Sequence, residues 1–211
     1  MEWEKWENIY KEILEDFGYN KEKDEESAKI AEELSSKNKK ADENYLRDII
    51  EGRVVSVCGA AISGEDIKKI EGLIISADET TSFLIKNGIY PDIIVTDLDG
   101  NMEDILKANE NGSLVIVHAH GDNIELIKKY LTKFKGIIMI TTQSKPHGSV
   151  YNFGGFTDGD RAYCIAKHFN AKRINLIGFN LSNPIKKEGK KLEIKRKKLE
   201  WAKKIMDTCS Q

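Results

Sequence analysis

The stretch Ile93-Ile94-Val95-Thr96-Asp97-Leu98-Asp99-Gly100 decides the fold that we expect for this chain. Its first four residues are apolar or β-branched, which predicts a strand buried on both faces, as in a parallel sheet covered by helices. Asp97 and Asp99 follow at the carboxyl end of this strand, where open α/β sheets bind their ligands. Two neighbouring carboxylates repel one another unless a cation lies between them, and Mg²⁺ prefers such oxygen ligands. The stretch therefore predicts a Mg²⁺ site on Asp97 and Asp99 and, with it, nucleotide phosphate chemistry.

Short apolar runs similar to this one alternate with helical segments along the chain. This alternation predicts an α/β fold with a mostly parallel, doubly wound sheet of about six strands and helices on both faces. The expected strands are Val54–Cys58, Leu73–Ser76, Ile93–Thr96, Leu114–Val117, Ile137–Thr141 and Ile174–Ile177. The expected helices between them are Glu65–Ile70, Thr80–Asn87, Glu103–Asn109, Ile124–Phe134 and Asp158–Phe169.

The N-terminal region predicts helices alone. Apolar side chains recur at three- and four-residue steps from Trp3 to Phe17, which predicts one amphipathic helix that Gly18 ends. Further helices are expected at Glu25–Leu34 and Asp42–Ile50. The apolar stripe of the first helix suggests a homodimer, although packing within the chain would also use it.

These patterns divide the chain in two. We expect a helical N-terminal extension over residues 1–50 and an α/β nucleotide-binding catalytic domain over residues 51–211. Ser35–Lys40 is interpreted as a polar connection. Lys187–Asp207 is interpreted as a long basic helix. Its dense lysines would form a solvated helix face or, alternatively, attract a polyphosphate.

The composition narrows the classes of function. The chain has 211 residues with 33 basic and 35 acidic side chains and a net charge of −2, so its charge favours neither nucleic acid nor a membrane surface. No apolar run approaches the ~20 residues of a spanning helix, and the N-terminus lacks the regions of a signal peptide. We expect a cytoplasmic protein that binds neither nucleic acid nor membrane.

The three cysteines give no sign of a disulfide or zinc site. Cys58, Cys164 and Cys209 form no CxxC pair and are interpreted as reduced thiols.

Small residues follow the first and last strands of the expected sheet. Gly59, Ser63 and Gly64 would let the backbone approach a nucleotide phosphate, or they would form an ordinary tight turn. Gly178 follows the last strand and, having no side chain, would leave space for a ligand at the same edge of the sheet. Asp78, after the second strand, would contact a ribose hydroxyl or cap the next helix.

Polar residues also follow the fourth strand. His118, His120 and Asp122 alternate onto one face of an extended chain. We expect His120 to contact a phosphate and Asp122 to serve as a metal ligand or polar anchor, with Gly121 and Asn123 beside the nucleotide. The alternative makes Asp122 a helix cap and His118 a core residue. The corresponding alternative to the Mg²⁺ site makes Asp97 and Asp99 a helix cap and a turn residue.

A long loop precedes the helix expected at Asp158–Phe169, and loops of this length inside a domain are usually functional. Its glycines permit close approach to a flat ligand, its phenylalanines would stack on a ring, and Asp158 or Asp160 would bond the polar edge of that ring. The alternative places the phenylalanines in the core and uses Thr157 or Asp158 as a helix cap. The residues expected to bind substrate are Asn152, Phe153, Gly154, Gly155, Phe156, Thr157 and Asp158.

Three segments carry a resemblance to a known family. Tyr90–Gly100, His118–Asn123 and Asn152–Ala162 resemble the archaeal 6-hydroxymethyl-7,8-dihydropterin pyrophosphokinases, and the resemblance covers nearly the whole chain. The order of motifs is also similar to thiamine pyrophosphokinases. However, Gly100 stands where those enzymes have a serine, and the other two motifs differ as well, which argues against thiamine as the substrate.

The resemblance implies an activity. ATP and 6-hydroxymethyl-7,8-dihydropterin would give AMP and the pterin diphosphate, as in tetrahydromethanopterin biosynthesis. Mg²⁺ would be held by Asp97 and Asp99, with or without Asp122, and a carboxylate or His120 would take the late proton. The loop ending at Asp158 would bind the pterin, and the carboxylate of Asp158 would pair with the amidine-like edge of the pterin ring in two hydrogen bonds.

Two functions from other classes use similar residues. A glycosyltransferase would hold a metal and a nucleotide sugar on the same pair of aspartates, and a nucleotide-binding module would bind without turnover. The short chain, with no second domain, favours the pterin enzyme.

Overall fold

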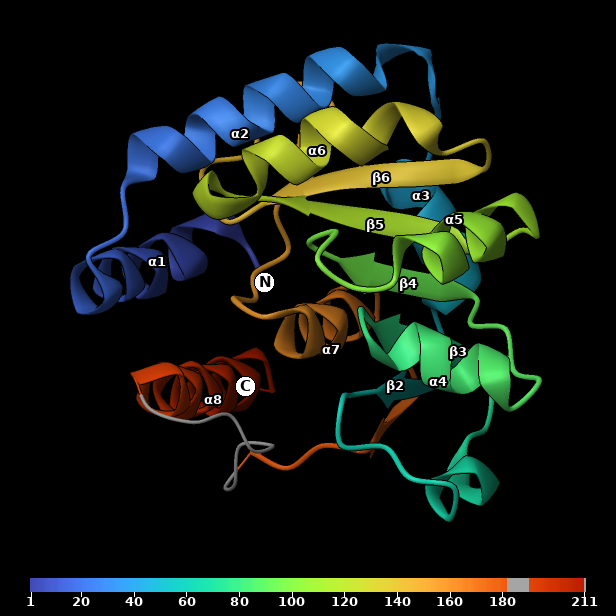
Figure 1. Ribbon diagram of the computed structural model, residues 1–211. Helices are drawn as coiled ribbons and strands as arrows, with labels where there is room; N and C mark the ends of the chain where they lie inside the picture. The colour runs from blue at the N-terminus through green and yellow to red at the C-terminus, as the bar shows by residue number, and fades with distance from the viewer. Residues whose placement is uncertain (182–189, 211) are drawn as a thin grey trace.

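The strand β4 (Ile93–Thr96) lies inside an eight-stranded sheet in which every paired strand is parallel. The computed structural model describes residues 1–181 and 190–210 of the chain (Figure 1). The strand order is β1-β6-β5-β4-β3-β2-β8, with β7 also paired to β6. The other strands are β1 (Lys39–Lys40), β2 (Val54–Cys58), β3 (Leu73–Ala77), β5 (Leu114–Ala119), β6 (Ile137–Thr142), β7 (Val150–Tyr151) and β8 (Arg173–Ile177).

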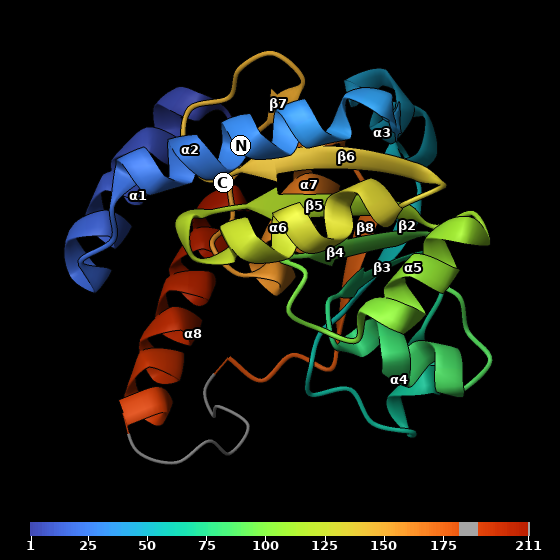
Figure 2. The same ribbon diagram turned by 45° about the horizontal axis from the view of Figure 1, so that its top comes forward.

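Helices cover both faces of this sheet, as Figure 2 shows. On one face α2, α5 and α6 bury apolar side chains such as Ala31, Ile105 and Ile127 against β5 and β6. On the other face α3 and α7 bury residues such as Leu46 and Ile165. The doubly wound parallel fold is confirmed. The helices are α1 (Trp3–Phe17), α2 (Lys21–Leu34), α3 (Glu43–Ile50), α4 (Thr80–Lys86), α5 (Met102–Glu110), α6 (Ile124–Tyr130), α7 (Asp158–His168) and α8 (Lys190–Cys209).

The expected elements agree with the structure except at a few short segments. The six predicted strands are present, and β1 and β7, of two residues each, add to them along the edge strand β6. The segment predicted as a polar connection therefore contains a strand. The helix predicted at Glu65–Ile70 is a 3₁₀ turn over Asp66–Lys69, and the helix predicted to reach Phe134 ends at Tyr130.

The N-terminal helix α1 packs within the chain, against α7 and α8. Trp6, Ile9 and Ile13 of its apolar stripe are buried in a cluster that includes Ile205 of α8. This stripe therefore has an intramolecular partner, and it lends no support to a homodimer.

A disulfide joins two helices of the C-terminal part. Cys164 and Cys209 form a disulfide between α7 and α8, so the prediction of three reduced thiols was wrong. The pairing arises because the two helices lie side by side, with these Cα atoms 5.9 Å apart across 45 residues of sequence. Cys58 is a buried free thiol.

The expected start of the last helix, at Lys187, lies outside the described residues. No helix that the structure describes has the length and apolar character needed to cross a membrane.

Candidate active site

Parallel pairing brings the ends of β3, β4 and β5 to one edge of the sheet. Ala77 lies opposite Val95, and Thr96 lies opposite Val117. The residues that follow these strands therefore lie close together. After β3 the chain turns at Asp78 (φ 33°), and after β4 it turns at Leu98 (φ 72°).

A hydroxyl holds the two turns against each other. Thr96 Oγ1 donates a hydrogen bond to Asp78 Oδ1 and accepts one from the backbone N–H of Leu98 at 2.9 Å. Gly100 is required beside them, because a Cβ there would collide with the carboxylate of Asp78. The geometry of Asp78 is thus fixed by its neighbours rather than by solvent.

Three carboxylates from different elements converge at this edge. One oxygen each from Asp78, Asp97 and Asp158 lies within 4.8 Å of the others, and Asp158 begins helix α7. Asp99 lines the same pocket, and its backbone N–H donates to Asp97 Oδ1 at 3.2 Å. Three carboxylate oxygens at this spacing are the ligands that a hard divalent cation such as Mg²⁺ prefers.

The charges of this cluster disturb one another. Burial raises the pKa of Asp78 to about 7, and the charges of Asp97 and Asp99 act in the same direction. Burial and the charge of Asp97 also raise the pKa of Asp158 well above its usual range. For Asp97 burial opposes ionisation, but hydrogen bonds from His120 and Asp99 outweigh it, and its pKa is lowered. The cluster therefore takes up protons near neutral pH unless a cation neutralises it.

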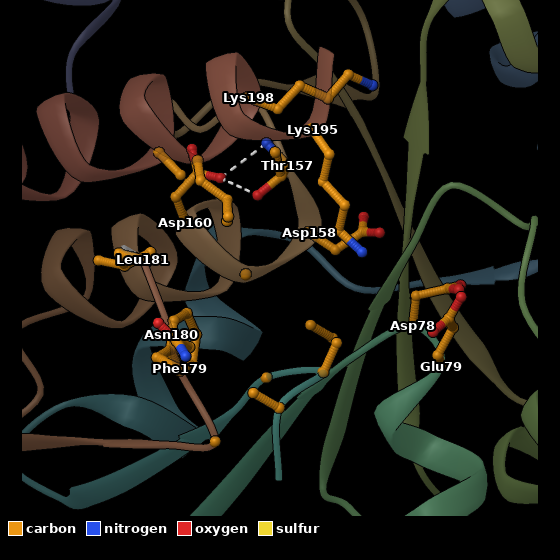
Figure 3. A pocket seen from close by; sticks show the side chains of 18 of the residues that line it. Asp78, Glu79, Thr157, Asp158, Asp160, Phe179, Asn180, Leu181, Lys195 and Lys198 are labelled. Carbon is orange, nitrogen blue, oxygen red and sulfur yellow. Dashed lines mark hydrogen bonds between the residues drawn. The ribbon is translucent and has the colours of Figure 1, made fainter. Parts of the chain in front are cut away.

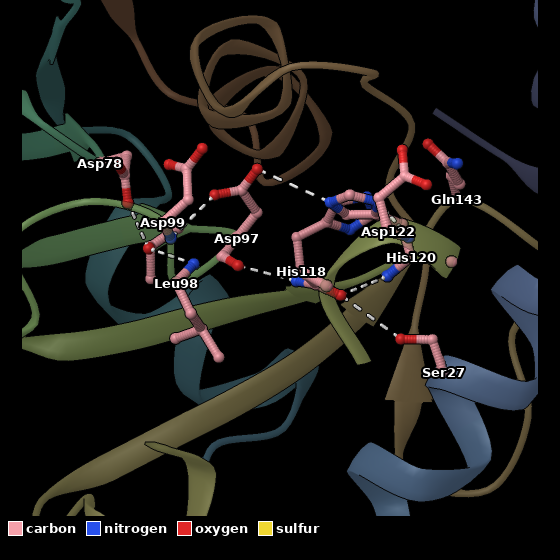
Figure 4. A network of polar contacts seen from close by, with 12 residues as sticks. Ser27, Asp78, Asp97, Leu98, Asp99, His118, His120, Asp122 and Gln143 are labelled. Atoms are coloured by element: carbon pink, nitrogen blue, oxygen red, sulfur yellow. Dashed lines mark hydrogen bonds and ion pairs between the residues drawn. The ribbon is translucent and has the colours of Figure 1, made fainter. Parts of the chain in front are cut away.

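A polar network joins this cluster to the end of β5 (Figure 4). His120 Nε2 lies 3.6 Å from Asp97 Oδ2, and His120 Nδ1 accepts the backbone N–H of Asp122 at 3.3 Å. The side chain of Asn123, which is 2% exposed, donates to the carbonyls of Asp97 at 2.8 Å and His118 at 2.7 Å. Asn123 therefore fixes the two loops to each other and does not face a ligand.

Two pockets open on either side of the acidic cluster. The first has a volume of about 270 Å³ and lies between the ends of β2 and β8, where the strand order reverses and α/β sheets bind ligands (Figure 3). Its lining includes Gly59, Ala60, Ala61, Asp78, Asp99, Gly178, Phe179, Lys195 and Leu199.

The second pocket, of about 190 Å³, lies beyond the end of β5. The two pockets share Asp97, Thr157, Asp158 and Lys198. The rest of its lining is Tyr19, Asn20, Lys23, Asp24, His118, His120, Gly121, Asp122, Gln143 and Phe156.

Several residues predicted for the site lie away from both pockets. Ser63 donates to Asp66 at the surface, and Gly64 faces solvent. Phe153 is 2% exposed and packs in the core against Phe169, so the core alternative holds for this ring.

The glycines and the asparagine of the same loop serve its own structure. The Asn152 side chain donates to the carbonyl of Ser144 and accepts the N–H of Gly154, both at 2.8 Å. Gly155, at φ 99°, lies against the backbone of Arg161. The part of the loop that lines a pocket is therefore Phe156 to Asp158.

No pattern in the sequence points to two buried residues at or behind the wall of the second pocket. The buried carboxylate of Asp24 accepts hydrogen bonds from Tyr10 (2.6 Å), Gln143 (2.8 Å) and the Gly121 backbone (2.7 Å). In the sequence Asp24 directly precedes the helix expected at Glu25–Leu34 and resembles an ordinary helix-capping acid. Arg161, also buried, contacts His118 Nε2 at 3.0 Å, and burial lowers its pKa to about 10.

The fold and the site together define a class of protein. A doubly wound parallel sheet with a cluster of carboxylates at its carboxyl edge, beside the point where the strand order reverses, is typical of α/β proteins that bind nucleotides.

Comparison with known proteins gives the family. The chain belongs to the MptE-like 6-hydroxymethylpterin diphosphokinase family, whose model matches residues 30–186. It is 41% identical to a protein of Methanocaldococcus jannaschii named 6-hydroxymethyl-7,8-dihydropterin pyrophosphokinase, over 98% of the chain and 95% of that protein. Proteins of the same name from Methanothermobacter thermautotrophicus and Pyrococcus furiosus are 38% and 37% identical, each over 98% of the chain and 94% of their own length. The resemblance drawn from the sequence motifs is confirmed.

Proposed function

We propose that this protein transfers a diphosphate from ATP to the hydroxymethyl group of 6-hydroxymethyl-7,8-dihydropterin and releases AMP. Membership of the family over nearly the whole chain supports this activity. The structural observation that carries it is the meeting of two pockets at Asp97, Thr157, Asp158 and Lys198, beside the cluster of three carboxylates. Two substrates bound on either side would bring the hydroxyl and the triphosphate together there.

The first pocket is the better fit for ATP. It lies at the reversal of strand order, and its wall includes Gly59 and Gly178, which let Phe179 and the Ile62 backbone pack closely behind it. A Cβ on Gly178 would collide with the backbone of Ile62, so glycine is required there. Small side chains at Ala60 and Ala61 extend this open wall.

The second pocket is the better fit for the pterin. Phe156, part of the predicted substrate loop, lies in its wall together with several polar groups. The carboxylate of Asp24 is already occupied by three hydrogen bonds, whereas that of Asp122 is exposed in the pocket. We therefore assign Asp122 to the amidine-like edge of the pterin, because a free carboxylate accepts two parallel N–H groups. Asp158, predicted for this role from the sequence, is assigned to the cation instead.

The acidic cluster fits Mg²⁺. Its donors are all carboxylate oxygens, and the pKa of Asp78 is raised first by burial and then by the charges of Asp97 and Asp99, which a bound cation would offset. Asp78, Asp97 and Asp158 would hold the ion, with Asp99 beside them. When bound, Mg²⁺ supplies positive charge that neutralises the phosphate oxygens during transfer.

The reaction is an in-line displacement at the β-phosphorus. The hydroxymethyl oxygen forms the new O–P bond, the bond from this phosphorus to the bridging oxygen of the α-phosphate breaks, and AMP leaves. The hydroxyl proton is lost late, so no strong base is required, and alignment of the reactants supplies most of the rate. His120 acts through Asp97, whose carboxylate it keeps ionised and oriented.

The test is a reaction of the purified protein with ATP, Mg²⁺ and the pterin alcohol, with products resolved by mass spectrometry. Pterin diphosphate together with AMP supports the proposal. Pterin monophosphate with ADP would indicate a simple kinase, and AMP formed without the pterin would indicate a hydrolase. The cytoplasmic location, the homodimer and the division at residue 50 stay predictions.

A further inference from the structure

The inward face of α8 changes character along its length. Its C-terminal part buries Ile205 and Ala202, and Leu199 continues this stripe at the rim of the first pocket. The next residues on the same face are Lys198 and Lys195, at helical spacing. A helix that only packs would continue the apolar stripe, so two lysines at this point need an explanation.

The wall opposite these lysines is strongly acidic. Asp78, Glu79 and Asp99 line the first pocket together with the shared carboxylates of Asp97 and Asp158. Among the described residues of this lining, Lys195 and Lys198 are the only lysine or arginine side chains. Figure 3 shows Lys195 extending from α8 toward the side of the pocket where Asp158 lies. A triphosphate beside so many carboxylates requires positive charge beyond that of one divalent cation.

Lys195 and Lys198 differ from other lysines of α8 in their ion pairing. Lys197 and Lys204 of the same helix pair with Asp16 at 2.8 Å and Glu12 at 2.6 Å. No ion pair joins Lys195 or Lys198 to a residue of 1–181 or 190–210. The Nζ of Lys198 lies 5.6 Å from the centroid of the Phe156 ring.

The helix that carries them is held firmly over the pocket. The disulfide between Cys164 and Cys209 joins its C-terminal end to α7, and Trp201 donates to Asp16 of α1 at 2.7 Å. Since α7 begins at Asp158, the contacts of α8 with α7 and α1 bring the lysines and the acidic cluster to one pocket. Helix α8 lies outside residues 30–186, which the family model matches.

We infer that Lys195 and Lys198 bind the phosphates of ATP, so that the C-terminal helix forms the cationic wall of the nucleotide pocket. This inference rests on the proposed function. Lys198 borders both pockets and therefore contacts the transferred phosphates, whereas Lys195 borders only the first and holds the nucleotide. Lys195→Gln should mainly raise KM for ATP, and Lys198→Gln should also lower kcat.

The test compares binding of ATP and AMP by calorimetry in Mg²⁺ buffer. A hydrogen bond to a charged group predicts that Lys195→Gln and Lys198→Gln each weaken ATP binding by about tenfold or more. AMP binding should change less than about twofold, because AMP lacks the β- and γ-phosphates. Lys203→Gln, at an exposed lysine of the same helix, is the matched control and should bind both nucleotides as wild type does. Lys195→Arg should restore most of the ATP affinity.

Wild-type ATP affinity in both glutamine variants overturns the inference. An equal loss for ATP and AMP also overturns it, because the pocket itself would then have changed. Failure of the proposed function gives a different result: ATP affinity would depend on the lysines, but the wild-type protein would form no pterin diphosphate.

Discussion

Replacing Asp78 by asparagine should stabilise the protein in the absence of divalent cations. Burial and the neighbouring acids raise the pKa of this carboxyl from its ordinary 3.8 to about 7. Between these values the folded state binds a proton that the unfolded state has lost, so the free energy of unfolding falls as pH rises toward 7. At pH 8 the ionised carboxylate lowers the free energy of unfolding by its full amount, at most about 4 kcal/mol. Asparagine removes the charge, and its Oδ1 still accepts the hydrogen bond from Thr96.

The assay is urea unfolding at pH 8, in EDTA and in Mg²⁺. We expect Asp78→Asn to be more stable than wild type in EDTA and to gain less stability from Mg²⁺, because one ligand of the cation is lost. Asp48→Asn, at an exposed carboxylate of α3, should match wild type in both buffers. A less stable Asp78→Asn in EDTA, or an equal gain from Mg²⁺ in both proteins, would refute the reasoning.

Three further predictions concern the same parts of the molecule. Mg²⁺ affinity should fall about tenfold from pH 8 to pH 6, because a proton on Asp78 competes with the cation below a pKa of about 7. Calorimetric titration with Mg²⁺ tests this, and an affinity that does not change with pH would contradict it. Cys209→Ser should lower the free energy of unfolding by at most about 4 kcal/mol, since the disulfide closes a loop of 45 residues, and unchanged urea midpoints would count against this disulfide. Phe153→Ala should lower the free energy of unfolding by about 3–5 kcal/mol and leave KM for both substrates unchanged, because this ring packs in the core. A folded variant with a higher KM for the pterin would show instead that the ring stacks on the substrate.

The fold was predictable wherever burial leaves a pattern. Strands such as β2 and β4 are covered on both faces, so their apolar runs appear directly in the sequence, with the bounds that the structure has. The short strand β1 is Lys39-Lys40, with both residues exposed, and its pairing with β6 depends on a neighbour almost 100 residues away. Local sequence carries no signal for such a contact.

The site was predictable one strand at a time, but its assembly was not. Asp97 follows an apolar run and could be recognised from its own segment, whereas its grouping with Asp78 and Asp158 depends on strand pairing and on the start of α7. Likewise, Lys198 is one of many lysines in the C-terminal segment, and only the packing of α8 distinguishes it from those that face solvent.

The most direct measurement is a crystal structure with Mn²⁺ in place of Mg²⁺, a non-hydrolysable ATP analogue and the pterin alcohol. We predict an anomalous peak within coordination distance of Asp78, Asp97 and Asp158, the triphosphate in the first pocket below Lys195, and the pterin hydroxymethyl group facing the β-phosphorus from the second pocket. A cation bound elsewhere, or both ligands in one pocket with these carboxylates facing water, would contradict the account.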